Sequence, residues 1–200
     1  FIFIAVSLTK LYTIFMHTLT FFDIDGTLFH TTACIRVINQ AGDSRALTNQ
    51  EFNHHTLQPG EVFDFTEFRS AEKFRKESIP VAHIIDRLKD ALNRHEDVRL
   101  LTAREDLDNK DTFLDTFRDV GIDIDRTHIH RSGNLKLDLS VADKKMIWVR
   151  RYIENNNYTC IKLYDDSIYN IHALKALEKD YPHIKFVGIY VLEDGTEQEY

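Results

Sequence analysis

The feature that most constrains the fold is a pair of acidic residues that directly follows an apolar run. The run, residues 19–22, has the composition of a buried strand and leads into Asp23-Ile24-Asp25-Gly26-Thr27-Leu28. Gly26 permits a sharp turn of the backbone after the two carboxylates. In an open α/β sheet, ligands bind beyond the carboxyl ends of the strands. Two carboxylates placed there suit a hard cation and a phosphoryl group.

Apolar periodicity along the rest of the chain predicts alternating strands and helices. Five strands are expected, at residues 19–25, 98–103, 127–131, 160–165 and 184–192. Four helices with one apolar face are expected between them, at about residues 81–92, 109–120, 143–155 and 168–179. Pro80 is expected in the first turn of the first helix, and Gly121 is expected to end the second. This alternation predicts an α/β fold with a mainly parallel sheet and helices on both faces.

Residues 30–75 interrupt this alternation. The segment starts with a hairpin-like run at residues 31–38 and continues with polar, turn-rich sequence that includes Pro59-Gly60. Because long loops are uncommon in compact domains unless they act as lids, we expect a small cap or flap, the alternative being a long surface connection. Four phenylalanines of the segment either stack on a nucleic-acid base or, as we prefer, form the cap's own core: Phe63, Phe65, Phe68 and Phe74.

The first fifteen residues are largely apolar but show no targeting pattern. Lys10 interrupts the apolar run, which is too short to span a bilayer, and the run lacks the basic region and cleavage site of a signal peptide. Met16 stands just before the first strand, so we expect it to be the functional start. Residues 1–15 would then be an N-terminal extension of the kind that a misplaced gene start produces. The predicted organisation is a core domain of residues 16–29 and 76–200, with residues 30–75 as its cap.

Composition restricts the partners and the setting. The formal net charge of −7 argues against nonspecific binding to nucleic acid or to an acidic membrane surface. The ten histidines form no spacing with cysteine that is typical of a zinc site. Two cysteines, Cys34 and Cys160, are too few for a disulfide framework, which favours a reducing, cytoplasmic location.

Three further polar features occur at or beside predicted strand ends. One strand ends with Thr102 and is followed by Arg104, another ends with Asp165-Asp166, and Asp143-Lys144-Lys145 opens a helix between them. Each feature has an ordinary interpretation alone, because threonine favours strands, Asp pairs cap turns and helices, and lysines usually lie on solvated faces. Their order along the chain, together with the first motif, makes a functional interpretation the stronger one.

In this order the motifs resemble those of the haloacid dehalogenase superfamily. The resemblance rests on Asp23-x-Asp25-Gly26-Thr27, Thr102, Lys144 or Lys145, and Asp165-Asp166, and it covers about residues 18–192. The layout is also similar to that of members encoded by large bacteriophages, for which the location would be the host cytoplasm. The resemblance implies a Rossmann-like (HAD-like) core with strand order 5-4-1-2-3, a small cap after the first strand, and Mg²⁺-dependent hydrolysis of phosphomonoesters.

The resemblance also implies a role for each matching residue. Asp23 is expected to be the nucleophile that becomes an aspartyl phosphate, and Asp25 the general acid and base. Thr102 and the lysine are expected to bind the phosphoryl group. The expected Mg²⁺ ligands are the carboxylates of Asp23 and Asp165 and the backbone carbonyl of Asp25, with Asp166 acting through the metal's water shell.

Two assignments stay open at this point. Lys145 shares a helical stripe with the apolar residues Val149 and Ile153, which favours it over Lys144 as the site lysine. Arg104 either binds the substrate or pairs with one of the two acidic residues that follow it, Glu105 and Asp106.

Other functions use the same acidic residues. A calcium loop is rejected, because Gly26 occupies the fourth rather than the sixth position and Cys34 stands where the twelfth-position glutamate belongs. A dehalogenase is disfavoured, because Asp25 and the Gly-Thr pair fit the phosphate-processing branch of the family. The alternative function is a catalytically inactive HAD-fold domain that binds a phosphorylated ligand or docks a partner. For the enzyme, the expected substrate is a nucleotide, a nucleic-acid end phosphate or a small metabolite.

Overall fold

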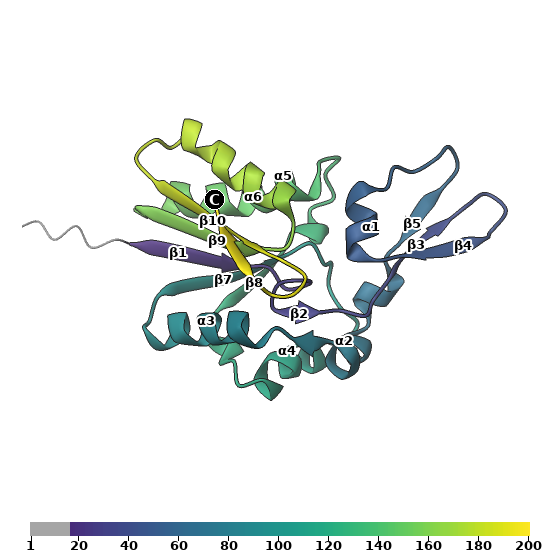
Figure 1. Ribbon diagram of the computed structural model, residues 1–200, viewed down its shortest axis with the longest axis horizontal. Helices are drawn as coiled ribbons and strands as arrows, with labels where there is room; N and C mark the ends of the chain where they lie inside the picture. The colour runs from purple at the N-terminus through teal and green to yellow at the C-terminus, as the bar shows by residue number, and fades with distance from the viewer. Residues whose placement is uncertain (1–16) are drawn as a thin grey trace, which may run out of the picture.

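A six-stranded sheet in the order β11-β10-β9-β1-β7-β8 forms the centre of the computed structural model (Figure 1), which describes residues 17–200. Neighbouring strands are parallel except β11, which runs antiparallel to β10. The expectation for residues 1–15 lies outside the described residues. The strands of this sheet are β1 (Thr18–Phe22), β7 (Asp97–Thr102), β8 (His128–Arg131), β9 (Cys160–Asp165), β10 (Lys185–Val191) and β11 (Glu197–Glu199).

The five predicted strands are all present, and they follow the predicted order 5-4-1-2-3. The short edge strand β11 was not predicted. β1 ends at Phe22, three residues before the expected end, because the chain turns at once after the strand. In this turn Gly26 has φ of 79°, and the backbone N–H groups of Leu28 and Phe29 both donate to the carbonyl of Ile24.

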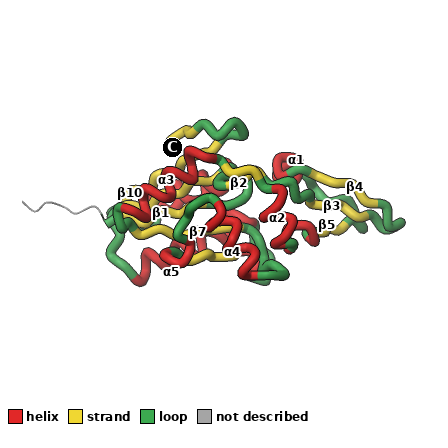
Figure 2. Tube along the Cα trace, turned by 90° about the horizontal axis from the view of Figure 1, so that it is seen from below, coloured by secondary structure: helices red, strands yellow, loops and turns green. Residues whose placement is uncertain are grey.

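Helices cover both faces of the sheet (Figures 1 and 2). Alternate residues of the strands explain this, because Phe22 packs in one core cluster and Phe21 in the other. The first cluster contains α3 (Ala82–Asn93) and α4 (Lys110–Asp119), and the second contains α5 (Val141–Asn155) and α6 (Ile168–Ala176). A 3₁₀ turn, Leu177–Lys179, continues α6. The expected position of Pro80 was wrong, because Pro80 lies in a short strand before α3.

The segment after β1 forms a small antiparallel insertion. β2 (Phe29–His30) pairs with β6 (Ile79–Pro80), so the chain leaves and re-enters the main body at adjacent points. Between them lies a three-stranded sheet that forms a lobe beside the main body (Figure 1). Its elements are β3 (Ile35–Ile38), β4 (Ser44–Leu47), α1 (Asn49–His54) and β5 (Val62–Asp64). A 3₁₀ turn (Thr66–Arg69) and α2 (Ala71–Glu77) lead back to β6.

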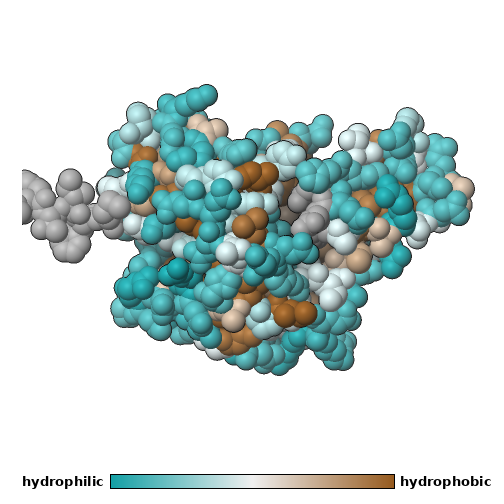
Figure 3. Space-filling view, viewed as in Figure 1, coloured by the Kyte–Doolittle hydropathy of each residue, from teal (hydrophilic) through white to brown (hydrophobic). Residues whose placement is uncertain are grey.

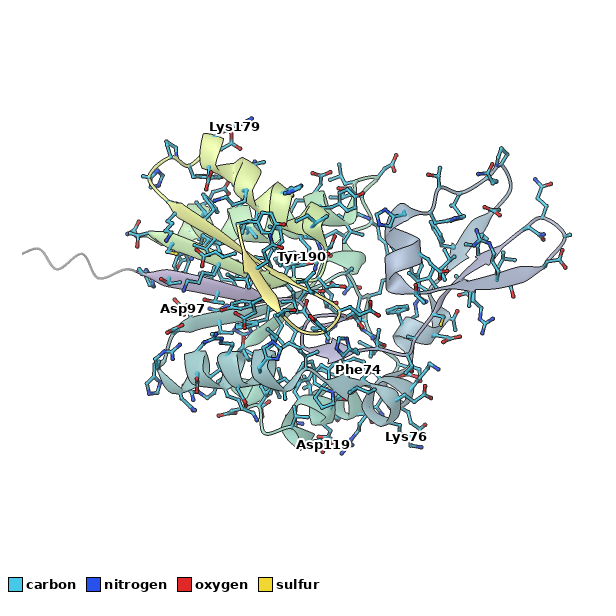
Figure 4. The ribbon with its side chains drawn as sticks, viewed as in Figure 1. Phe74, Lys76, Asp97, Asp119, Lys179 and Tyr190 are labelled. Carbon is cyan, nitrogen blue, oxygen red and sulfur yellow. The ribbon has the colours of Figure 1, made fainter. Side chains whose placement is uncertain are left out.

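The four phenylalanines of this segment have different environments. Phe63 and Phe65 contact each other and Phe52, so these three form a small aromatic cluster within the insertion. Phe74, labelled in Figure 4, is instead 2% exposed and belongs to the main core, where its ring contacts rings of α4. The prediction that these residues form the cap's own core is therefore wrong for Phe74. The ring of Phe68 lies against the buried guanidinium group of Arg104.

The face of the molecule seen in Figure 3 offers little apolar area. Hydrophilic side chains cover most of the face seen in Figure 3, and apolar side chains show only in small separate patches. Among residues 17–200, no helix has both the length and the apolar character that crossing a bilayer requires.

Candidate metal centre and active site

Three of the predicted site residues meet at the carboxyl edge of the main sheet. β1 lies between β7 and β9 and is parallel to both. Asp23 directly follows β1, and its backbone N–H donates to the carbonyl of Tyr164 in β9 at 2.9 Å. Thr102 and Asp165 are the last residues of β7 and β9. The strand order thus places the three side chains side by side, as expected of groups that follow adjacent parallel strands.

A buried lysine of α5 joins two of the acidic residues. The Nζ of Lys145 lies 2.8 Å from Oδ1 of Asp23 and donates to Oδ2 of Asp165 at 2.7 Å. Lys145 is 1% exposed, whereas its neighbour Lys144 is half-buried. The helical stripe explains the difference, because Val149, one turn further along α5, is fully buried.

Asp165 is held by more partners than the sequence indicated. Its Oδ1 accepts from the backbone N–H of Ser167 at 2.9 Å and from Nδ2 of Asn170 at 2.8 Å, while Oδ2 faces Lys145. Asp165 is fully buried and Asn170 is 4% exposed. Sequence reasoning missed Asn170. It could have been noticed as a polar residue in the first turn of the helix that follows the Asp pair.

Asp23, Asp165 and Asp166 form a cluster able to hold a metal ion. One carboxylate oxygen from each residue lies within 4.8 Å of the others. Burial raises the pKa of Asp23 to about 7, and the charges of Asp165 and Asp25 add to this effect while Lys145 opposes it. Burial, followed by the charges of Asp23 and Asp165, also raises the pKa of Asp166 well above its usual value. Repulsion among confined carboxylates is the condition that a cation relieves.

The same charges act on the lysine in the opposite sense. Burial disfavours the charged form of Lys145, but Asp165 and Asp23 outweigh it and raise the pKa of the ammonium group. Lys145 therefore stays charged and offsets one of the three carboxylates when all are ionised. Two negative charges remain, which matches a divalent cation.

The turn after Asp25 is packed tightly against this cluster. A Cβ atom on Gly26 would lie 2.1 Å from Oδ2 of Asp166. The motif glycine is thus required twice, for its φ of 79° and for the approach of Asp166. Thr27 is fully buried, and its Oγ1 has no hydrogen-bond partner among the described residues.

Thr102 is fixed by its neighbours. Its side chain is fully buried, its Oγ1 accepts from the backbone N–H of Arg104 at 3.1 Å, and its carbonyl accepts from Oγ of Ser132 at 3.0 Å. The acceptor role of Oγ1 toward Arg104 leaves the hydroxyl hydrogen as the donor that a phosphoryl oxygen would need.

The carboxylate of Asp25 binds Arg104 instead of joining the acidic cluster. Nε and Nη2 of Arg104 donate to Oδ2 and Oδ1 of Asp25 at 2.8 and 2.6 Å. Of the two alternatives for Arg104, pairing with Glu105 or Asp106 is wrong, since Arg104 pairs with Asp25 and Glu105 pairs with Arg69 and Lys136. The carboxylate of Asp25 is not among the three that cluster, and a contribution of its backbone carbonyl to a metal stays a prediction.

Comparisons with known proteins give this chain no relative. No family model, no curated protein and no solved structure matches it. The functional argument therefore rests on the site itself.

Proposed function

We propose that this chain is a Mg²⁺-dependent phosphomonoester hydrolase of the haloacid dehalogenase type, with Asp23 as its nucleophile. One observation carries the proposal: three carboxylates within 4.8 Å of one another lie at the carboxyl edge of a parallel sheet, and buried Lys145 bridges two of them. An acidic cluster supplemented by a buried cation fits the joint binding of a metal ion and a phosphoryl group.

The residues support two chemical steps. In the first, a carboxylate oxygen of Asp23 bonds to phosphorus, the ester P–O bond breaks, and Asp25 protonates the leaving oxygen. In the second, Asp25 takes a proton from water as the water oxygen bonds to phosphorus, which breaks the bond to Asp23 and releases phosphate. Lys145 holds Asp23 in place and offsets negative charge in both steps, and Thr102 donates to a phosphoryl oxygen.

The donor set fits Mg²⁺. Asp23, Asp165 and Asp166 supply only oxygen ligands, and the two charges left uncompensated by Lys145 suit a divalent ion. When bound, Mg²⁺ would supply electrostatic stabilisation of the phosphoryl oxygens. The raised pKa values of Asp23 and Asp166 support this assignment, because they reflect burial of charged carboxylates and, after it, their mutual repulsion, and a bound cation would lower both costs.

A second candidate is an inactive domain of this fold that binds a phosphorylated ligand or a partner. The pairing of Asp25 with Arg104 favours it, since the guanidinium of Arg104 donates to both oxygens of the Asp25 carboxylate. Binding without turnover would distinguish this candidate from the enzyme.

The deciding experiment is hydrolysis of p-nitrophenyl phosphate by the purified chain. We expect turnover with Mg²⁺ that is lost in EDTA and restored by added Mg²⁺. Asp23→Asn should lower kcat by at least about 10³-fold while the circular dichroism spectrum stays unchanged. Asp86→Asn is the matched control, because Asp86 is an exposed residue of α3 whose side chain is 72% exposed.

Two outcomes would contradict the proposal: undiminished activity in metal-free protein, and wild-type turnover in Asp23→Asn. A panel of nucleoside monophosphates and of oligonucleotides with 3′- or 5′-phosphates then identifies the substrate class. For a nonspecific phosphatase we expect little difference across this panel.

A further inference from the structure

Arg104 is buried at the point where the insertion meets the main body, and all three nitrogens of its guanidinium group form hydrogen bonds. It is 4% exposed, although arginine is rarely buried to this extent without a dedicated partner. Nε and Nη2 bind the two oxygens of Asp25, and Nη1 donates to the backbone carbonyl of Phe68 at 2.6 Å. Such a fork of parallel bonds fixes both the position and the plane of the carboxylate.

Side chains from both ends of the insertion cover the guanidinium group of Arg104 as well. The ring centroids of Phe68 and Phe74 lie 4.9 and 4.5 Å from its central carbon, and Oγ1 of Thr31 lies 3.4 Å from Nη2. Thr31 and Phe68 stand at the two ends of the insertion, after β2 and before α2. The guanidinium therefore cannot turn toward a substrate unless these groups move. Its orientation depends on how the insertion packs against the main body.

We propose that Arg104 is a positioning residue that aims the carboxylate of Asp25 at the leaving group, and that the insertion sets this aim through Phe68 and Thr31. The proposal rests on the proposed function, because it gives Asp25 the acid and base role described above. It replaces the expectation that Arg104 binds substrate. Among the described residues, the side chain of Arg104 contacts Asp25, Thr31, Phe68 and Phe74, so Arg104 acts through Asp25.

The test compares two substrates that differ in leaving group but hardly in size. The phenolate of phenyl phosphate is a poor leaving group and needs proton donation. The p-nitrophenolate of p-nitrophenyl phosphate leaves readily without a proton. Misplacing Asp25 should therefore damage the first reaction selectively. For Arg104→Gln we expect kcat to fall about 10²- to 10⁴-fold with phenyl phosphate and less than about 10-fold with p-nitrophenyl phosphate. KM should change little for either substrate.

A double-mutant cycle with Asp25→Asn identifies the route of the effect. If Arg104 acts through Asp25, the double variant Asp25→Asn with Arg104→Gln should hydrolyse phenyl phosphate no more slowly than Asp25→Asn alone. Arg104→Lys keeps the charge but loses the fork, so it should recover part of the lost activity. Arg104→Lys also decides the matter if Arg104→Gln does not fold.

Arg69→Gln provides the matched control. Arg69 also joins the insertion to the main body, through Glu105 at 2.5 Å, but it is 58% exposed and has no contact with Asp25 among those described. We expect Arg69→Gln to leave the ratio of the two rates unchanged. The same selective loss in Arg69→Gln, equal losses for both substrates in the Arg104 variants, or additive effects in the cycle would overturn the proposal. Absence of any hydrolysis by the wild type would instead overturn the proposed function, and this assignment with it.

Discussion

Asp23→Asn should stabilise the metal-free protein at neutral pH, and the structure gives the size of the effect. Asp23 is 5% exposed, and burial raises its pKa from 3.8 to about 7. The native state therefore binds more protons than the unfolded state between about pH 4 and pH 7, so the free energy of unfolding falls as pH rises through this window. Below pH 4 the residue is neutral in both states and contributes nothing. Above pH 7 the penalty is complete.

This rise in the pKa of Asp23 corresponds to a penalty of about 4 kcal/mol in the free energy of unfolding. Asparagine imitates the protonated carboxyl group and cannot ionise, so the variant escapes the penalty. The gain over wild type should grow from near zero at pH 4 to about 4 kcal/mol at pH 8. Asp165 remains 2.7 Å from Lys145 in the variant and keeps the buried ammonium group paired. Removing this one carboxylate thus leaves no isolated buried charge.

The assay is urea unfolding in EDTA at intervals between pH 4 and pH 8, for wild type, Asp23→Asn and the surface control Asp86→Asn. The control should stay within about 0.5 kcal/mol of wild type at every pH. Added Mg²⁺ should then stabilise wild type more than Asp23→Asn, since a ligand at 100 times its Kd contributes about 2.7 kcal/mol. A difference between wild type and Asp23→Asn that does not change with pH would refute the reasoning, because the charge of Asp23 would then carry no cost.

Two further predictions concern a glycine and a phenylalanine. Gly26→Ala should push Asp166 away, because the new Cβ would lie 2.1 Å from its Oδ2, and should raise the Mg²⁺ concentration needed for activity. Gly121→Ala has almost the same φ, 78° against 79°, so in thermal melts it should show a similar strain of about 1–2 kcal/mol while the Mg²⁺ dependence stays unchanged. Phe74→Ala should cost about 3–5 kcal/mol in urea unfolding, because Phe74 is buried in the main core. Phe65→Ala, at a position 41% exposed, should cost clearly less, and equal losses would contradict the placement of Phe74.

The parts of the structure that the sequence predicted well depend on local patterns. Apolar runs and helical periodicity located the five parallel strands and the helices between them, because each pattern reflects which face of an element is buried. The position of Lys145 follows from the same reasoning, since residues four positions apart on a helix share a face. The edge strand β11 was missed because Glu197–Glu199 has neither the apolar content nor the β-branched residues of a strand. Residues 197–199 form a strand only because they pair with β10.

The contacts that sequence reasoning missed are those between residues far apart in the chain. Arg104 was expected either to bind the substrate or to pair with its neighbour Glu105 or Asp106, but its side chain pairs with Asp25, 79 residues away. Local charge pattern carries no information on such a pair, because the carboxyl ends of β1 and β7 become neighbours only when the sheet forms. Phe74 was likewise assigned to the cap by its place in the sequence, although α2 returns it to the main core.

The error on Phe74 has its physical origin at the junction where the two ends of the insertion pack into the main body, and Arg104 lies at this junction too. The pairing of β2 with β6, the burial of Phe74 and the contact of Phe68 with Arg104 all lie at this junction. A segment attached by one flexible linker would leave Asp25 unaffected by its position. Here the backbone carbonyl of Phe68 binds the guanidinium that holds Asp25, so any movement of the insertion at this junction must change either the Phe68 contact or the Asp25 contact. The selective loss expected for phenyl phosphate in the Arg104 variants measures how far Asp25 depends on Arg104, the residue through which this coupling passes.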